Sequence, residues 1–221
     1  MVRDYAILPR ESGPLRTNWS VNINWSDIDM LINTLCAASH VLCCKFLGWQ
    51  IHGERPTEDK VMILGAPHTS NLDYFLTLAL IHHFRLPLRY LIKDNVFKGP
   101  LGPLIKSLGG IPVDRSKSNN LVDTMVATVQ NQDEIALGVL PEGTRKYVDY
   151  WKSGFYWIAQ GADLPIYPVR VDGPGRRLDM GPRMNVSGDI EADVALLADF
   201  FGETKGVKPE NSGPVRVRPR S

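Results

Sequence analysis

Residues 61–73 read VMILGAPHTSNLD, an apolar run that ends at a proline and gives way to a short polar turn. The run over 61–66 has the length and composition of a buried β-strand, and the proline after it marks its end. Either Ser70 or Asn71 can cap a helix that would follow over 73–84. This stretch therefore predicts a strand, a loop and a helix in immediate succession.

The same stretch places an imidazole and a carboxylate five residues apart, at His68 and Asp73. On one continuous helix the two side chains would point about 140° apart, so their contact requires His68 in the loop and Asp73 in the first helical turn. The carboxylate can then accept one ring N–H, which leaves the other ring nitrogen free to take a proton from a substrate hydroxyl. The pair therefore indicates a general base. Without that contact, Asp73 would only favour the helix N-terminus and His68 would be an ordinary loop residue.

Strand-like and helical patterns alternate through the rest of the chain, which predicts an α/β fold. We expect a single domain with a mostly parallel central sheet flanked by helices and an N-terminal amphipathic helical segment. Strands are predicted at 61–66, 88–92, 111–113, 135–140 and 166–171, and apolar stripes at helical spacing lie in 121–129 and 190–201. The glycines and prolines of 98–103 predict a bent loop instead of a helix.

Length and composition are consistent with one domain. At 221 residues the chain can bury a substantial core, and it is too short for two full domains. We divide it into an N-terminal extension over 1–25, a domain over 26–205 with its amphipathic helix at 26–49 and its motifs at 61–172, and a flexible tail over 206–221. The tail is assigned because this part of the chain is rich in Pro, Gly, Ser and Arg.

Charge and cysteine content argue against several kinds of partner. The formal net charge is +1, so no global basic field favours nucleic acid. Three cysteines, an odd number in a chain in which we recognise no signal peptide, argue against a disulfide framework and for a reducing cytosol. The His and Cys residues do not have the spacing of a metal site, so we expect neither a metal nor another resident cofactor.

The segment 26–49 could form a helix long enough to cross a bilayer, but its polar residues argue against crossing. Asp29, Asn33 and His40 form a polar stripe on an otherwise apolar helix, which suits a helix that lies at the membrane surface. The segment is flanked by tryptophans, as interfacial anchors would be, at Trp19, Trp25 and Trp49. The alternative is that the helix simply packs on the domain.

Three further blocks follow the His-Asp stretch. GGIPVDRS at 109–116 contains Arg115, PEGTR occupies 141–145, and the apolar run PIYPV, with a proline near each end, occupies 165–169. Any one block is a weak signal. The four in this order resemble the glycerophosphate and lysophosphatidate acyltransferase superfamily, over roughly Trp49 to Asp172.

The resemblance implies which residues act. His68 and Asp73 correspond to the catalytic pair of that superfamily. The acceptor site would be formed by Arg115, Glu142, Gly143, Thr144 and Arg145. The chain departs from the family pattern at Pro67, where many members have a small polar residue or Asn, and at Lys146, where Ser is usual. Neither departure removes a group that the chemistry needs, although Lys146 could alter the acceptor preference.

The resemblance also implies a reaction. A fatty acyl group would move from a thioester of coenzyme A or acyl carrier protein to a hydroxyl of a lysophospholipid or glycerol phosphate acceptor, as in the 1-acylglycerol-3-phosphate O-acyltransferases of phospholipid biosynthesis. We expect direct attack by the acceptor, because the chain has no Gly-x-Ser-x-Gly elbow and its cysteines lie far from the motif in sequence. The expected location is cytoplasmic, peripheral on the inner face of the cell membrane.

Two other functions fit part of the pattern. An ester or thioester hydrolase could use the same histidine to activate water, but it would leave Arg115 and the 142–145 block without a function. A non-catalytic membrane-surface lipid-binding protein would need only the amphipathic segment, and it predicts indifference to changes at His68 and Asp73. The identity of the accumulating product, free acid or acylated acceptor, separates the hydrolase from the transferase.

Overall fold

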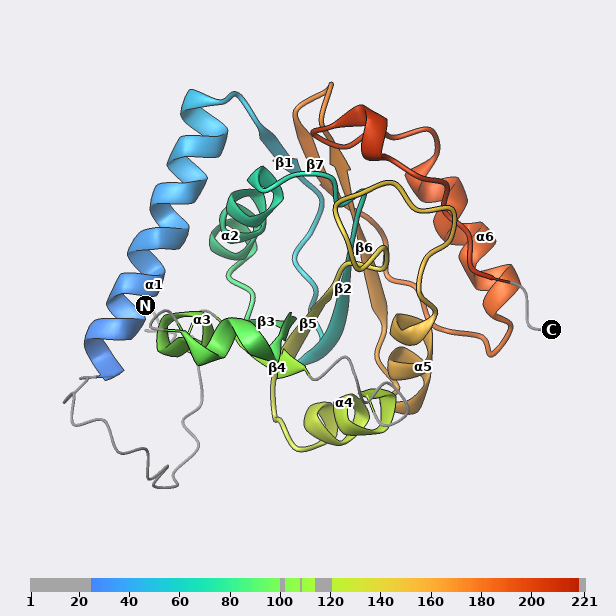
Figure 1. The fold of residues 1–221 in the computed structure, drawn as a ribbon, viewed down its shortest axis with the longest axis horizontal. Coiled ribbons are helices and arrows are strands. Elements are labelled where there is room, and N and C mark those ends of the chain that lie inside the picture. The colour runs from blue at the N-terminus through green and yellow to red at the C-terminus, as the bar shows by residue number, and fades with distance from the viewer. Residues whose placement is uncertain (1–24, 100–101, 108, 114–120, 219–221) are drawn as a thin grey trace.

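The computed structural model describes residues 25–99, 102–107, 109–113 and 121–218. Seven strands form one sheet in the order β1-β7-β6-β2-β5-β3-β4, with helices on both faces (Figure 1). The strands are β1 (Gln50–His52), β2 (Lys60–Ala66), β3 (Leu88–Lys93), β4 (Gly110–Val113), β5 (Ile135–Val139), β6 (Ile166–Asp172) and β7 (Arg177–Met180). The helices are α1 (Trp25–His40), the π-helix η1 (Val41–Phe46), α2 (Leu72–Phe84), the 3-10 helix η2 (Asp94–Lys98), α3 (Gly102–Ser107), α4 (Leu121–Gln130), α5 (Gly154–Gly161), α6 (Ile190–Phe201) and the 3-10 helix η4 (Pro209–Asn211).

The sheet is parallel at every pairing except β6 with β7, which run antiparallel. β2 lies at the centre of the strand order, between β5 and β6. The structure therefore confirms the predicted α/β domain with a mostly parallel sheet. Because β2 and β5 are parallel neighbours, their carboxyl ends meet at the same edge of the sheet, which is where open α/β folds bind ligands.

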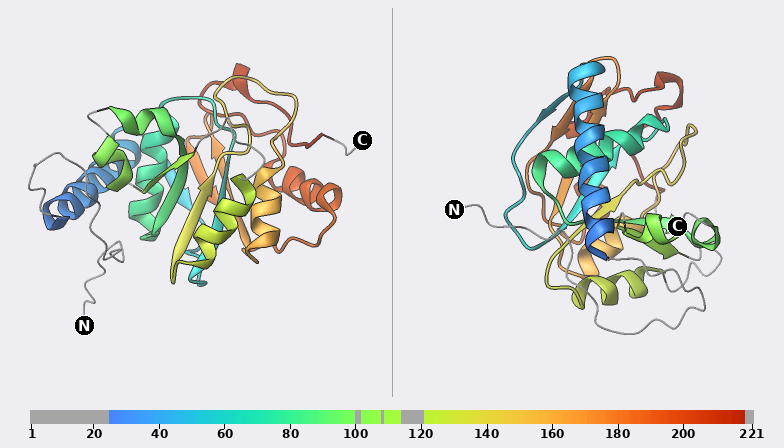
Figure 2. Two further views of the ribbon diagram at one scale, coloured as in Figure 1. Left: turned by 60° about the horizontal axis from the view of Figure 1, so that its bottom comes forward. Right: turned by 90° about the vertical axis from the view of Figure 1, so that its left-hand side faces the viewer.

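Alternate residues of β2 face two separate hydrophobic cores. Val61 and Ile63 belong to the core shared with α1, η1 and α2, whereas Met62 and Leu64 belong to the core shared with α4, α5 and α6. Figure 2 shows these two groups of helices on opposite faces of the sheet. Burial on both faces explains why the β2 sequence is a nearly continuous apolar run without alternation.

The five predicted strands are present, and β1 and β7 are additional. These two strands have three and four residues, too few for an alternating pattern to be visible in the sequence. The structure also corrects the bent loop predicted over 98–103, because Gly102 and Pro103 open helix α3. Proline is tolerated in a first helical turn, where its missing N–H would have no helical partner.

The predicted N-terminal helix corresponds to α1 and η1, and it ends at Phe46 instead of residue 49. It packs on α2, and Cys36 and Cys43 are buried in the core that these helices share. Trp49 is also a core residue, with only 5% of its surface exposed, so it is not the interfacial anchor that we expected. Trp19 lies outside the described residues. In the part of the chain that the structure describes, no helix is long and apolar enough to cross a membrane.

One residue of the expected polar stripe contacts α2. The ring centroid of His40 lies 5.2 Å from that of His82 and 5.6 Å from that of His83. Burial lowers the pKa of His40, and the two histidines of α2 lower it further by charge repulsion. This part of the stripe is therefore neutral at physiological pH and is used for packing.

The chain after α6 packs against the loop that precedes α5. The main-chain N–H of Trp151 donates to the carbonyl of Arg216 over 2.8 Å, and Trp151 and Val217 form an isolated parallel bridge. Ser212 is buried. Residues 206–218 thus pack against the domain, an arrangement that their composition did not predict, and residues 219–221 lie outside the described part.

Candidate active site

His68 lies just after the end of the central strand β2, at the carboxyl edge of the sheet. β2 ends at Ala66, the loop over 67–71 follows, and α2 begins at Leu72. This is the strand, loop and helix that the sequence predicts. The neighbouring strand β5 ends at Val139 and is followed by the loop that carries the PEGTR block. The parallel pairing of β2 with β5 therefore brings two motifs together that lie more than seventy residues apart.

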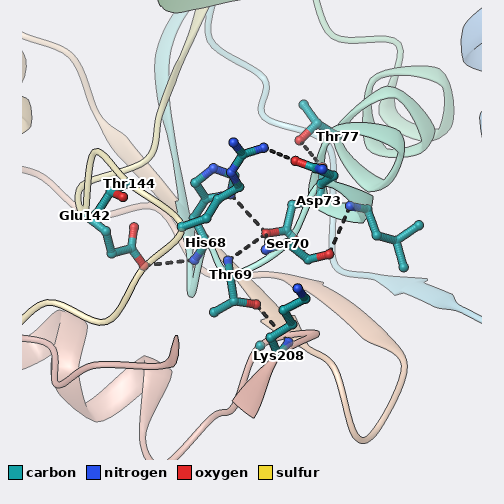
Figure 3. A network of polar contacts seen from close by, with 12 residues as sticks. His68, Thr69, Ser70, Asp73, Thr77, Glu142, Thr144 and Lys208 are labelled. Atoms are coloured by element: carbon teal, nitrogen blue, oxygen red, sulfur yellow. Dashed lines mark hydrogen bonds and ion pairs between the residues drawn. The ribbon is translucent and has the colours of Figure 1, made fainter. Parts of the chain in front are cut away.

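His68 and Asp73 face each other across the start of α2 (Figure 3). The distance from Nδ1 of His68 to Oδ2 of Asp73 is 3.0 Å. The Asp73 side chain is 6% exposed and that of His68 is 19% exposed, so the carboxylate is buried while the imidazole reaches the surface. With Nδ1–H donating to the carboxylate, Nε2 carries a lone pair, and it has no hydrogen-bond partner among the described residues. This arrangement can accept a proton from a hydroxyl.

Asp73 also organises the loop that carries His68. Its Oδ2 accepts from the main-chain N–H of Thr69 over 2.8 Å and from that of Ser70 over 2.9 Å. The hydroxyl of Ser70 accepts in turn from the N–H of Leu72 over 3.1 Å, so Ser70 satisfies one main-chain donor at the start of α2, although the N-cap position itself is occupied by Asn71. The side chain of Asn71, the other predicted cap, makes no capping hydrogen bond to the helix. Its oxygen accepts from Arg145 instead.

Glu142 lies under the same loop. Only 7% of its surface is exposed, and its Oε1 accepts from the main-chain N–H of His68 over 3.0 Å. Its Oε2 is buried and has no partner within the described residues. Burial raises the pKa of the Glu142 carboxyl to about 7, although the hydrogen bond from His68 acts in the opposite direction. The carboxyl is therefore directed at the loop of His68, and neither of its oxygens is open to an acceptor hydroxyl in this structure.

The PEGTR block becomes more exposed after Glu142, because Gly143 and Thr144 are half-buried and Arg145 is exposed. A guanidinium N–H of Arg145 donates to the side-chain oxygen of Asn71, which links the two loops. The hydroxyl of Thr144 accepts from the N–H of Lys146 over 3.3 Å and closes a local turn. Gly143 has a φ of +65°, and a Cβ there would lie 2.9 Å from Nζ of Lys152. The positive φ favours glycine at this position, whereas the flexible lysine side chain could move aside.

The structure does not place every predicted residue. It brings together His68, Asp73, Glu142 and the loop of Gly143, Thr144 and Arg145. Arg115 lies outside the described residues; the strand before it, β4, ends at Val113 on the far side of β5 and β3 from β2. Across the ranges described above, no group of three or more His, Cys, Asp or Glu residues could hold a metal ion.

The sequence did not indicate that the loop of His68 contacts the C-terminal part of the chain through Thr69. The hydroxyl of Thr69 accepts from the main-chain N–H of Lys208 over 3.0 Å. The two residues are 139 positions apart, and a contact made through a main-chain donor leaves no pattern of side chains to recognise.

Comparison with known families gives an independent assignment. A family model described as Acyltransferase matches residues 48–172, more than half of the chain. The chain belongs to the acyltransferase family. The match confirms the resemblance to the glycerophosphate and lysophosphatidate acyltransferases and covers nearly the same span. It includes both loops of the site in this acyltransferase, and it leaves out α1, α6 and the C-terminal segment. No curated protein sequence matches the chain.

Proposed function

We propose that this acyltransferase moves a fatty acyl group from a thioester to a hydroxyl of a lysophospholipid or glycerol phosphate acceptor, with His68 as the general base. One observation carries the proposal: Nδ1 of His68 is fixed by a buried carboxylate, while Nε2 has no partner within the described part of the chain. Family membership supplies the acyl transfer, and the orientation of the imidazole supplies the means of activating a hydroxyl.

The reaction has two proton transfers. Nε2 of His68 takes the proton of the acceptor hydroxyl as its oxygen attacks the thioester carbonyl carbon, and a tetrahedral intermediate forms. The intermediate collapses with cleavage of the carbon–sulfur bond, and the leaving thiolate takes the proton from the imidazolium. Asp73 holds the ring in one tautomer and stabilises its charged form between the two steps.

We propose direct transfer without an acyl-enzyme. Two hydroxyls lie close to His68 in sequence: that of Thr69 accepts from the N–H of Lys208, and that of Ser70 accepts from the N–H of Leu72. Cys36 and Cys43 are buried in the core between the helices, and burial raises the pKa of both thiols, which disfavours the nucleophilic thiolate. The acceptor hydroxyl is therefore the nucleophile that best fits the site.

The loop that carries the PEGTR block has cationic side chains that could bind the phosphate of the acceptor. Arg145 is exposed and is tied to the loop of His68 through Asn71, and Lys152 lies over Gly143. An arginine fork can meet two phosphate oxygens at once. We propose that Arg145 and Arg115 bind the phosphate of a 1-acylglycerol-3-phosphate-like acceptor, that Thr144 shapes their loop, and that Glu142 positions His68. The donor is an acyl thioester of coenzyme A or acyl carrier protein, used as a co-substrate.

We further propose that the enzyme acts in phospholipid synthesis on the inner face of the cell membrane. Three apolar side chains of η1 are exposed, with Phe46 the most exposed at 77%. The other two are Val41 and Leu42, at 39% and 42%. Exposed apolar side chains at the end of an amphipathic helix are typical of peripheral membrane attachment.

The decisive experiment is an acceptor panel. The wild-type enzyme and His68→Ala are incubated with a labelled acyl thioester and each of several lysophospholipids or glycerol 3-phosphate, and the products are read by lipid mass spectrometry. We expect an acylated acceptor from the wild type, and a loss of roughly 10²- to 10⁴-fold in His68→Ala. His52→Ala is the matched control, because His52 is also hydrogen-bonded to a carboxylate, that of Asp179, but lies on β1. Free fatty acid without acylated acceptor would reject the transfer in favour of hydrolysis.

A further inference from the structure

The C-terminal segment over 205–218 contacts both loops of the site, although it lies outside the family match. Near its start, the N–H of Lys208 donates to the hydroxyl of Thr69, which follows His68 directly (Figure 3). Near its end, the carbonyl of Arg216 accepts from the N–H of Trp151, in the loop that follows the PEGTR block. One stretch of chain therefore spans the two halves of the site.

The contact at Thr69 is tightly packed. Thr69 is 2% exposed, and Gly206 is buried against it. A Cβ at residue 206 would lie 2.5 Å from the Thr69 hydroxyl oxygen, closer than atoms of this kind approach in folded proteins. The N–H of Gly206 donates to the hydroxyl of Ser212 over 2.9 Å, which folds the segment back on itself through η4. The position of Thr69 is thus set by a closed turn of the C-terminal segment.

The contact with the second loop is equally close. At Gly213 a Cβ would overlap the carbonyl of Val148, so only glycine allows the segment to pass there. Arg216 then donates through Nε to the carbonyl of Asp149 over 2.8 Å and lies over the ring of Tyr150. These contacts fix the segment to the loop that carries Glu142 and Arg145.

We propose that Thr69 and Gly206 are positioning residues of the acyltransferase site, because they fix the C-terminal segment to the loop of His68 and so set its place relative to the loop of Glu142. This inference rests on the proposed function. His68 is held through its ring by Asp73 and through its main chain by Glu142, while Thr69 is the only residue of the described loop tied to the C-terminal segment by a side-chain hydrogen bond. A displacement of a reacting group by about 1 Å can cost about 100-fold in rate, so the bond at Thr69 affects turnover more than substrate binding.

The test compares two substitutions at one position in the full chain. Thr69→Val keeps the shape of the side chain and removes the acceptor for the Lys208 N–H, whereas Thr69→Ser keeps the acceptor. We expect kcat for acyl transfer to fall about 10- to 100-fold in Thr69→Val, with both KM values within about threefold of the wild type, and to recover in Thr69→Ser. Glu210→Ala, which removes an exposed side chain of the same segment, is the control and should transfer at the wild-type rate.

Wild-type kcat in a folded Thr69→Val enzyme would overturn the inference. An equal loss of kcat in Thr69→Val and Thr69→Ser would also overturn it. If Thr69→Val does not fold, Ser212→Ala decides, because it opens the turn of the C-terminal segment without touching the loop of His68. A lower kcat at unchanged KM in Ser212→Ala supports the inference, and an unchanged kcat overturns it. Failure of the wild type to acylate any acceptor would instead reject the proposed function, so the two failures are distinguishable.

Discussion

At the scale of single residues, one carboxylate oxygen organises the candidate site. Oδ2 of Asp73 accepts from the ring of His68 and from the main-chain N–H groups of Thr69 and Ser70. A buried donor left without an acceptor costs about 1–3 kcal/mol. Asp73 therefore maintains the loop as well as the imidazole, whereas the only function that we propose for the side chain of His68 is that of the general base.

This difference predicts that the two members of the pair separate in a stability measurement. Asp73→Ala and His68→Ala should both reduce acyl transfer by roughly 10²-fold or more. Only Asp73→Ala should also lower the free energy of unfolding, by about 2 kcal/mol or more, because two main-chain donors lose their acceptor. Urea unfolding of both variants at neutral pH measures the effect. An equal loss of stability in His68→Ala would contradict the assigned division of functions.

Glu142 gives a prediction with a defined pH dependence. Burial raises the pKa of its carboxyl to about 7, well above the value of 4.5 in an unfolded chain. Between these two pH values the folded state binds the extra proton, so the stability of the wild type falls as pH rises through this window and stays lower above it. In Glu142→Gln the charge is absent, while an amide oxygen can still accept from the His68 N–H.

We therefore expect Glu142→Gln to gain stability relative to the wild type as pH rises from 5 to 8, by up to about 3 kcal/mol. Urea unfolding across that range measures the difference. Glu134→Gln serves as the control, because the side chain of Glu134 is 49% exposed and its substitution should give no such trend. A difference between Glu142→Gln and the wild type that is the same at every pH would argue against a buried carboxyl with a raised pKa.

At the scale of elements, a charged cluster joins the strands at one side of the sheet. Asp179 on β7 accepts from His52 on β1 over 3.0 Å, from Arg170 on β6 over 2.8 Å and from Arg177 over 2.9 Å. Burial alone would raise the pKa of Asp179, but these hydrogen bonds outweigh it and lower the pKa to about 2. The cluster thus connects β1 and β7, the two strands that sequence patterns do not reveal.

The lowered pKa predicts where this stabilisation is lost. A carboxylate with a depressed folded pKa contributes stability above its unfolded value near 3.8, and the contribution disappears as pH falls toward about 2. Asp179→Asn should therefore cost about 1–2 kcal/mol at pH 7, and the difference from the wild type should shrink between pH 4 and about 2. Urea unfolding at several pH values tests this. Asp149→Asn, whose side chain is 63% exposed in a 3.5 Å ion pair, should change little.

At the scale of the whole molecule, α1 with η1 and α6 lie on opposite sides (Figure 1). Each side carries a prominent exposed apolar side chain: Phe46 on η1 is 77% exposed, and Leu196 on α6 is 59% exposed. If the membrane binds the side of η1, as proposed, the two residues should differ in their effect on membrane binding.

Flotation with anionic phospholipid vesicles provides the comparison. We expect the wild-type protein to float with the vesicles, and Phe46→Ser to bind them roughly tenfold more weakly, because an aromatic side chain is lost from the apolar phase. Leu196→Ser should float like the wild type. Equal weakening by both substitutions, or wild-type protein that stays at the bottom of the gradient, would reject the proposed orientation.

The elements that could be predicted from the sequence are those stabilised by interactions between residues close together in the chain. Long apolar runs such as 61–66 are buried in almost any arrangement of the sheet, and the caps and turns around them are local, so β2 and the start of α2 are visible in the sequence. The short strands β1 and β7 are stabilised by their neighbours and by the Asp179 cluster, so they leave little local signal. The N-terminal helix was predictable, but its packing against α2 was not, because an apolar stripe does not identify what covers it.

The sequence by itself determined the local geometry of the pair His68 and Asp73. It places a histidine in a loop and an aspartate at the start of the following helix, and five residues of chain are enough to bring them within 3.0 Å. Only the tertiary structure decided what surrounds this pair. The contacts of His68 with Glu142 and of Thr69 with Lys208 join residues 74 and 139 positions apart, and both use a main-chain N–H as donor. Every residue except proline carries that donor, so its partner depends on how the strands and the C-terminal segment pack and is not encoded in a local pattern.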